Sequence, residues 1–399
     1  GIEILAKDKL APNSRFYGGV NYIQVHVDSQ LIFNQSIDKL NVGKGRHILT
    51  VMDFKTLRNN GTRFYKLFLD DGNGLNFYDK SPGDGKIKVD SGDDKDVEVT
   101  MKDSFGNASK LSFRLRPTPV TKEVTLLEPL KNDVEYDVYE NILMITTQPC
   151  QPDSNRATVY SRDRRHIIEP DYANANRAVY LLDLRTEIPD SVVVCKRSVV
   201  PKIVASIPSK GPYGYYSDRM DVQFPANAVY DTVYLNADHT IFPDSSEIFT
   251  MGSPYVPLNK TVKVTLRPAK KIKWTDSMGI YRVEGRGYSH LGGKWENGAV
   301  HFSTREFGDF TILQDLNPPT IRPVIVNGHS ARFKIHDDLS GISSYRATID
   351  GQWLLMYYDS KTSTIWSERL DKDVLLKGEF KLVVVDQAGN RTVYTDHLK

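Results

Sequence analysis

The sequence contains few of the residues that cross-linked scaffolds require. Only two of its 399 residues are cysteines, Cys150 and Cys195. Two cysteines are too few for a disulfide scaffold, and these two lie too far apart in sequence for a zinc knuckle. A single bridge between them and a pair of buried thiols are both compatible with the pattern.

The sequence also lacks the motifs of common reactive centres. No two of its nine histidines lie within five residues of each other, so neither His-x-His nor His-Glu-x-x-His occurs. There is no Gly-x-Ser-x-Gly elbow, and neither cysteine lies in a nucleophile signature. The glycine-rich segment 285–293 lacks the Lys-Ser/Thr ending of a phosphate loop and predicts a hairpin. We therefore predict no catalytic residue and no resident metal centre in this chain.

An excess of one charge and a long apolar run are both missing. The 52 lysines and arginines nearly balance the 50 aspartates and glutamates, and no basic stripe stands out, which argues against nucleic acid as a partner. No run of eighteen apolar residues occurs, so we expect no membrane span. The chain opens with Gly1 and shows no signal peptide, which is typical of a mature or trimmed chain.

The composition favours β-sheets. Aromatic residues make up 10% of the chain, including 21 tyrosines, and valine and threonine recur throughout. A chain of this length is too long for a single core, so two to four domains are expected.

One module occurs twice. The segments VTMKDSFGNASKLSF (99–113) and LVVVDQAGNRTVY (382–394) share an Asp-x-x-Gly-Asn motif, and both are preceded by a second matching pair, GGVNYIQVHVDSQL (18–31) and SGISSYRATIDGQW (340–353). The earlier pair is offset by 322 residues and the later pair by 283, so the first copy carries 39 extra residues between its two signatures. Shared order and shared motifs on both sides of one insertion indicate a repeat.

The periodicity of the module predicts an antiparallel β-sandwich. Ile23, Val25 and Val27 alternate with polar residues up to the turn at Asp28, and FKLVVVD (380–386) predicts a buried strand before the Gly-Asn turn. We predict an all-β chain of several antiparallel, immunoglobulin-like sandwiches in tandem. The expected domains are a sandwich with an insertion at 1–116, a small β domain at 117–199, a sandwich at 200–316 and a repeat of the first at 317–399. Helix-compatible segments are short, such as PANAVYD (225–231).

Two sets of residues are candidates for binding. Trp353, Tyr357, Tyr358 and Trp366 are expected to come together on one hairpin, where exposed rings would stack on sugars, although a core role for the tryptophans is an equal alternative. Asp70, Asp71, Asp103 and Asp386 are candidate calcium ligands, but aspartates at such positions more commonly stabilise turns. The acidic segment 83–99 fits a solvated hairpin edge better than an acid/base pair.

The chain resembles a known family over nearly its whole length. The segment TRFYKLFLDDGNGLNFYDKSPGDGKIKVDSGDDKDVEVTMKDSFGNASKLSF (62–113) is similar to the β region behind the catalytic domain of lysostaphin-type zinc metallopeptidases of Gram-negative envelopes. The blocks GGKWENGAVHFSTREFGDFTILQDLNPPTIRP, DDLSGISSYRATIDGQWLLMYYD and LLKGEFKLVVVDQAGNRTVY resemble the end of the same proteins. That family hydrolyses peptide cross-links in peptidoglycan with one zinc ion, held by His and Asp of a first motif and by a His-x-His motif. Neither motif is present, so no catalytic residue transfers to this chain.

The resemblance implies an envelope function without catalysis. We expect the non-catalytic accessory region of a peptidoglycan hydrolase, in the periplasm or at the bacterial surface, whose zinc would belong to a domain upstream of Gly1. Its expected partners are that peptidase domain or an envelope protein, with peptidoglycan or another glycan as a further ligand. The alternative is a stand-alone surface protein that binds glycans or mediates adhesion.

Overall fold

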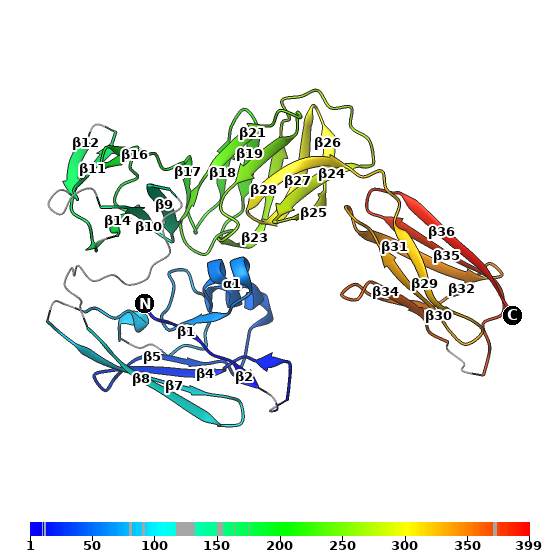
Figure 1. Cartoon of the computed structure of the whole chain (residues 1–399), viewed down its shortest axis with the longest axis horizontal. Helices are drawn as coiled ribbons and strands as arrows, with labels where there is room; N and C mark the ends of the chain where they lie inside the picture. Colours follow the sequence, from blue (N-terminus) through cyan, green and yellow to red (C-terminus); the bar gives the residue numbers. More distant parts are fainter. Residues whose placement is uncertain are drawn as a thin grey trace.

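The chain is built almost entirely of antiparallel strands. A computed structural model describes residues 1–9, 11, 13–79, 82–89, 92–116, 132–149, 155–162, 164–174, 176–369 and 373–399. Its strands form separate sheets around four clusters of buried hydrophobic residues, which confirms the predicted all-β class. We name four units after these clusters: N-terminal (1–116), second (132–199), third (205–315) and C-terminal (320–398). The C-terminal unit extends away from the other three and adjoins the third (Figure 1).

The N-terminal unit has one four-stranded sheet covered on one face. The sheet has the order β5-β4-β7-β8 and comprises β4 (Tyr22–Val27), β5 (Gln30–Ser36), β7 (Lys95–Lys102) and β8 (Ala108–Leu115). The remaining elements are β1 (Glu3–Leu5), which pairs with β6 (Phe64–Lys66), β2 (Asp8–Lys9), which pairs with β3 (Tyr17–Gly18), and the helices η1 (Val42–Thr50), α1 (Phe54–Asn60) and η2 (Pro82–Gly85). As predicted, Ile23 and Val25 point into the core.

The helices of the N-terminal unit lie inside the predicted insertion. The Asp53 carboxylate accepts hydrogen bonds from the amides of Lys55 and Thr56 and so begins α1, and Gly61 ends it at φ 74°. The helix-compatible segment 225–231 forms no helix: it contains a turn, in which Asn227 has a φ of 57°. Pro225 directly follows a strand there, and a left-handed residue two positions later prevents a helical turn.

The second unit is a small sandwich of two four-stranded sheets. One sheet, β13-β14-β10-β9, comprises β9 (Val134–Tyr139), β10 (Ile142–Thr147), β13 (Tyr172–Ala173) and β14 (Ala178–Asp183). The other, β12-β11-β15-β16, comprises β11 (Ala157–Ser161), β12 (Arg164–Ile168), β15 (Ser191–Val194) and β16 (Arg197–Val199). Cys195, in the turn after β15, is disulfide-bonded, whereas Cys150 lies outside the described residues.

The third unit is a larger sandwich of two five-stranded sheets. One sheet, β18-β19-β23-β27-β26, comprises β18 (Tyr213–Tyr216), β19 (Met220–Phe224), β23 (Pro257–Leu266), β26 (Lys294–Glu296) and β27 (Ala299–Glu306). The other, β21-β22-β28-β24-β25, comprises β21 (Ala237–Ile241), β22 (Glu247–Met251), β24 (Met278–Glu284), β25 (Gly287–Gly292) and β28 (Gly308–Gln314). A short pair, β17 (Ala205–Ile207) and β20 (Val233–Leu235), faces the second unit, and Tyr234 of β20 packs against that unit's core.

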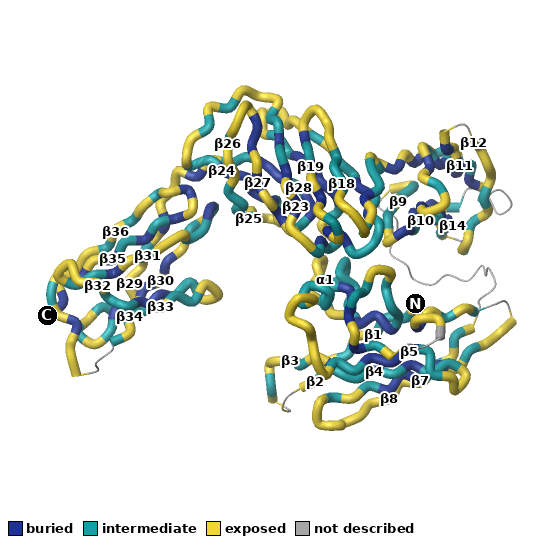
Figure 2. Tube along the Cα trace, turned by 180° about the vertical axis from the view of Figure 1, so that it is seen from behind, coloured by how far each residue is buried: buried dark blue, intermediate teal, exposed yellow. Residues whose placement is uncertain are grey.

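The C-terminal unit is a sandwich of two four-stranded sheets. One sheet, β29-β30-β34-β33, comprises β29 (Thr320–Val326), β30 (Ala331–His336), β33 (Met356–Asp359) and β34 (Thr364–Ser367). The other, β32-β31-β35-β36, comprises β31 (Ile342–Ile349), β32 (Gln352–Leu354), β35 (Gly378–Asp386) and β36 (Arg391–Leu398). The burial pattern alternates along β35, so this strand is buried on one face only, not on both as its apolar run suggests (Figure 2).

The N-terminal and C-terminal units share one sheet strand for strand. The order β5-β4-β7-β8 matches β32-β31-β35-β36 in chain direction and pairing. The Asn107 amide and side chain donate to the Asp103 carboxylate, and Asn390 makes the same two bonds to Asp386. The second sheets differ, because the N-terminal unit has the two-stranded sheet β1–β6, whereas the C-terminal unit has the four-stranded sheet β29-β30-β34-β33. The predicted domain boundaries themselves stay predictions.

Candidate functional site

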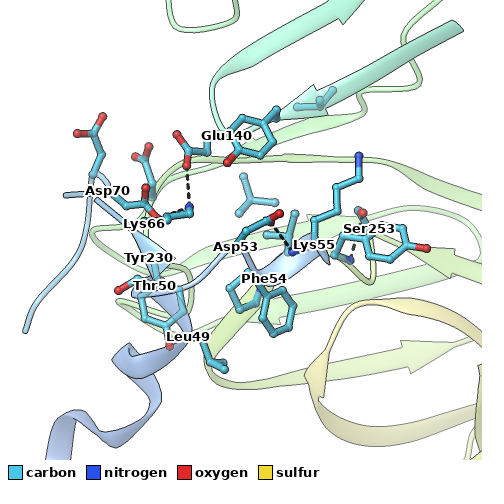
Figure 3. A pocket seen from close by; sticks show the side chains of 18 of the residues that line it. Leu49, Thr50, Asp53, Phe54, Lys55, Lys66, Asp70, Glu140, Tyr230 and Ser253 are labelled. Atoms are coloured by element: carbon cyan, nitrogen blue, oxygen red, sulfur yellow. Dashed lines mark hydrogen bonds and ion pairs between the residues drawn. The ribbon is translucent and has the colours of Figure 1, made fainter. Parts of the chain in front are cut away.

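A pocket lies where the N-terminal, second and third units meet (Figure 3). We call this meeting point the seam. Its walls come from the segments around α1 and β6 of the N-terminal unit, from the β9–β10 turn of the second unit and from residues 230–233 and 253–257 of the third. The cavity measures about 140 Å³, well below the roughly 300–1,000 Å³ of pockets that enclose organic ligands. Its size therefore suits water or a small ion.

A buried lysine ties two of the units together at this pocket. Lys66 is 7% exposed, and its Nζ lies 2.5 Å from Asp70 Oδ2 within the N-terminal unit and 3.2 Å from Glu140 Oε1 of the second unit (Figure 3). The Tyr139 hydroxyl donates a hydrogen bond of 3.4 Å to Glu3 Oε1. Lys66 ends β6 and Glu140 occupies the β9–β10 turn, so the two strand ends fix the geometry of the ion pairs.

Burial and neighbouring charges change the pKa values of Asp70 and Lys66. Burial raises the pKa of Asp70 to about 7; the charge of Glu140 adds to the increase, and Lys66 opposes it. Burial alone would lower the pKa of Lys66, but the charge of Asp70, followed by Tyr139 and Glu140, raises it above its usual value. Lys66 therefore stays positively charged at all physiological pH values, whereas Asp70 exchanges its proton near neutrality.

Further polar contacts close the seam against the third unit. The Arg46 guanidinium donates to the Leu258 carbonyl from Nε at 3.1 Å and Nη2 at 2.9 Å, and the Tyr230 hydroxyl donates to the Arg46 carbonyl at 2.7 Å. Asn141 of the second unit donates to Asp231 of the third at 2.6 Å. These bonds join all three units, so the seam is an interface that sets their relative orientation.

The predicted aromatic platform is divided between the two sheets of the C-terminal unit. Tyr357 is 48% exposed on β33 and stacks on Trp366 of the neighbouring β34, with ring centroids 6.0 Å apart. Tyr358 points to the other face of the same strand and packs against the core. Trp353 is 61% exposed but belongs to β32 of the opposite sheet, so the expectation that all four rings share one hairpin is wrong. The short loop after Leu354 carries the chain from one sheet to the other.

The candidate calcium ligands have different surroundings. Asp70 is the partner of Lys66, and Asp71 is exposed near Lys86 Nζ at 3.4 Å and Arg185 Nη1 at 3.8 Å. Asp103 forms a turn, as the sequence favours over a calcium site, and accepts from Phe105 N at 2.8 Å as well as from Asn107. Asp386 forms the same turn but is 1% exposed and lies beside two further carboxylates, Asp315 and Asp337. Nothing in the sequence indicates that Asp386 lies near Asp315 and Asp337, because Asp315 precedes the double proline and belongs to the third unit.

A comparison with known protein families gives a match in the third unit. Residues 210–315 match the family model described as a Zu5-like domain, which covers most of the third unit and about a quarter of the chain. No curated protein matches the sequence. The resemblance to lysostaphin-type peptidases stays a prediction. Within the part of the chain that the structure describes, no helix has the length and apolar character needed to cross a bilayer.

Proposed function

We propose that this chain is the non-catalytic accessory region of a bacterial cell-envelope peptidoglycan hydrolase. In this role it holds an upstream zinc peptidase domain in a fixed orientation, in the periplasm or at the cell surface. The observation that carries the proposal is the seam, where three units are joined by an ion pair of the buried Lys66 and by part-buried hydrogen bonds around a pocket too small for an organic substrate.

The first residues of the chain are held at the seam, which supports a role in orienting a preceding domain. The Leu67 amide donates to the Ile2 carbonyl at 2.9 Å, and β1 pairs with β6 beside Lys66. Glu3 accepts the hydrogen bond from Tyr139 of the second unit. A domain preceding residue 1 would therefore leave directly from the seam and be oriented by it, because residues 2–5 are held in a sheet.

A direct test measures the release of soluble muropeptides from purified peptidoglycan sacculi by chromatography. We expect no release by the chain of 399 residues and release by the protein extended upstream to its natural start. Zinc removal from the longer protein with a chelator should abolish the release. Release by the shorter chain, or the absence of release by both, would contradict the proposal.

The exposed aromatic residues favour a second candidate, a stand-alone glycan-binding or adhesion protein. Trp353 and Tyr357 present apolar ring surface of the kind that stacks on sugar faces. Co-sedimentation of the chain with sacculi tests this function: the double variant Trp353→Ala/Tyr357→Ala should lose binding, and Tyr216→Ala should retain it. Tyr216 is a matched control because it is 66% exposed but lies on the third unit. Equal binding by both variants would exclude Trp353 and Tyr357 as the residues that bind the glycan.

A further inference from the structure

Three aspartates converge at the junction between the third and C-terminal units. Asp315 directly follows β28 of the third unit, Asp337 follows β30 and Asp386 ends β35 of the C-terminal unit. One carboxylate oxygen from each lies within 4.8 Å of the others. Asp315 and Asp386 are each only 1% exposed, and Asp337 is half-buried. The cluster therefore brings three carboxylates from two units together in a largely solvent-excluded site.

Neutral donors hold these carboxylates without balancing their charge. Asp315 accepts from the Asn317 amide at 3.1 Å and the Ser340 amide at 3.0 Å, and Asp337 accepts from the Gly341 amide at 2.6 Å. Among the described residues, no lysine, arginine or histidine forms a salt bridge with any of the three. Buried like charges at this spacing repel each other, and a cation bound between them would offset that repulsion.

A buried hydroxyl provides an independent indication of a ligand. Tyr281 of β24 is 0% exposed, and its hydroxyl oxygen has no hydrogen-bond partner among the described residues. Its ring lies 4.9 Å from that of His290, whose Nδ1 is 3.3 Å from the side-chain oxygen of Gln387, the residue after Asp386, so Tyr281 lies at the same junction as the cluster. An unpartnered buried hydroxyl is destabilising, and a water bound to a cation in the cluster would supply the missing partner.

The ligand set selects a hard cation. The donors on offer are oxygens alone, which suits calcium or magnesium rather than zinc. Oxygens bound to one Ca²⁺ at about 2.3–2.6 Å lie no more than about 5 Å apart, so the spacing of the cluster fits a single calcium ion. Mg²⁺ requires shorter distances and near-octahedral geometry, whereas Ca²⁺ accepts ligands from irregular loops such as these.

We propose that Asp315, Asp337 and Asp386 bind one Ca²⁺ ion, with Tyr281 facing it, and that this ion fixes the C-terminal unit against the third. Ligands from both units would make the angle between them depend on calcium. Asn390 reinforces the same contact, since its side chain donates to the Asp315 carbonyl at 3.0 Å as well as to Asp386.

The repeat supplies a matched control for this site. Asp103 accepts the same two bonds from Asn107 that Asp386 accepts from Asn390, but it is only half-buried, and it belongs to no group of three candidate ligands among the described residues. Asp103→Asn therefore changes a turn alone. Asp337→Asn removes a charge from the cluster while its side-chain oxygen can still accept from the Gly341 amide.

Calorimetric titration of the chelator-treated full chain with CaCl₂ tests the proposal. We expect one site with a Kd between about 10 µM and about 1 mM, the range of moderate to weak calcium modules. Asp337→Asn should weaken binding at least about tenfold, the effect expected when one charged ligand is lost. Asp103→Asn should bind as the wild type does, and MgCl₂ should compete poorly.

Two further measurements on the wild-type chain test the proposal even if a variant folds poorly. Calcium should raise the Tm of the wild-type C-terminal unit, and small-angle scattering should show a narrower range of overall dimensions with calcium than with chelator. A folded wild-type chain that shows neither heat nor a Tm change at about 10 mM Ca²⁺ would overturn the proposal, since that concentration exceeds the weakest class of sites. Equal loss of binding in Asp103→Asn and Asp337→Asn would also overturn it.

Discussion

Replacement of Lys66 by methionine tests the energetics of the seam. Lys66 is 7% exposed and the side chain of Asp70 is 12% exposed, so the variant leaves a buried carboxylate without its cation. Loss of one partner of a buried ion pair typically costs about 3–5 kcal/mol. We expect a loss of about 3 kcal/mol at pH 8, the lower end of this range. The Glu140 side chain is 44% exposed, so solvent screens its interaction with Lys66.

The penalty should depend on pH with a defined sign. The pKa of Asp70 is about 7 in the folded chain because of burial, and near 4 when unfolded. Between these values the folded chain holds a proton that the unfolded chain has released, so stability falls as the pH rises through this window. Lys66 does not titrate there, since its own pKa is raised. At pH 5 Asp70 is protonated in the folded chain, so Lys66→Met loses mainly a hydrogen bond, worth about 1 kcal/mol. The loss of stability grows toward pH 8, where Asp70 is ionised and lacks its cation in the variant.

Hydrogen exchange measured by mass spectrometry is the appropriate assay. All four tryptophans, Trp274, Trp295, Trp353 and Trp366, lie in the third and C-terminal units, so fluorescence does not report the N-terminal side of the seam. Hydrogen exchange in peptides covering β6 and the β9–β10 turn gives the free energy of local opening on that side of the seam. Lys86→Met is the control, because its pair with Asp71 is more than half exposed and is worth less than about 1 kcal/mol. Equal penalties for the two variants, or a pH-independent penalty for Lys66→Met, would refute the reasoning.

Two further substitutions probe packing in other places. In Gly72→Ala, the new Cβ would lie 1.8 Å from the Tyr230 carbonyl oxygen at a φ of 78°, so we expect a loss of about 2–4 kcal/mol in hydrogen-exchange stability of the seam. Gly61→Ala, at a similar φ of 74° but with nothing within 4 Å, should lose only about 1 kcal/mol, and equal effects would contradict the clash. Phe380→Ala removes a fully buried ring stacked 5.6 Å from Phe333, and should destabilise the C-terminal unit by about 3–5 kcal/mol. Urea unfolding should then show an earlier fluorescence transition for Trp366, and an unchanged midpoint would contradict the packing.

Local patterns in the sequence predicted much of the fold, because they depend on near neighbours. Alternation identified Ile23 and Val25 as core residues, and the Asp-x-x-Gly-Asn motif predicted turns that have the same hydrogen bonds in both copies. The helix α1 was missed although its signals, Asp53 before it and Gly61 after it, stand in the sequence. The hairpin edge expected at 83–99 is wrong for 95–99, because β7 lies between β4 and β8 in its sheet, although Asp94 and Asp96 do form ion pairs with exposed arginines.

The seam and the aspartate cluster could not be predicted, because each depends on contacts between units. Asp70 looked like an ordinary turn residue, and nothing near it in sequence indicates that Glu140 shares its lysine. Asp315 meets Asp386 only after the C-terminal unit folds and docks beside the third. The division of Trp353 from Tyr357 likewise follows from the crossing between sheets, which alternation along one strand does not specify.

The sequence of the gene upstream of the codon for Gly1 tests the account most directly. The proposed positioning role predicts that the reading frame continues upstream and encodes a domain with a His-x-His motif, preceded by an export signal. A start codon immediately before Gly1, or an upstream domain without zinc ligands, would contradict the proposal that this chain serves a peptidoglycan hydrolase.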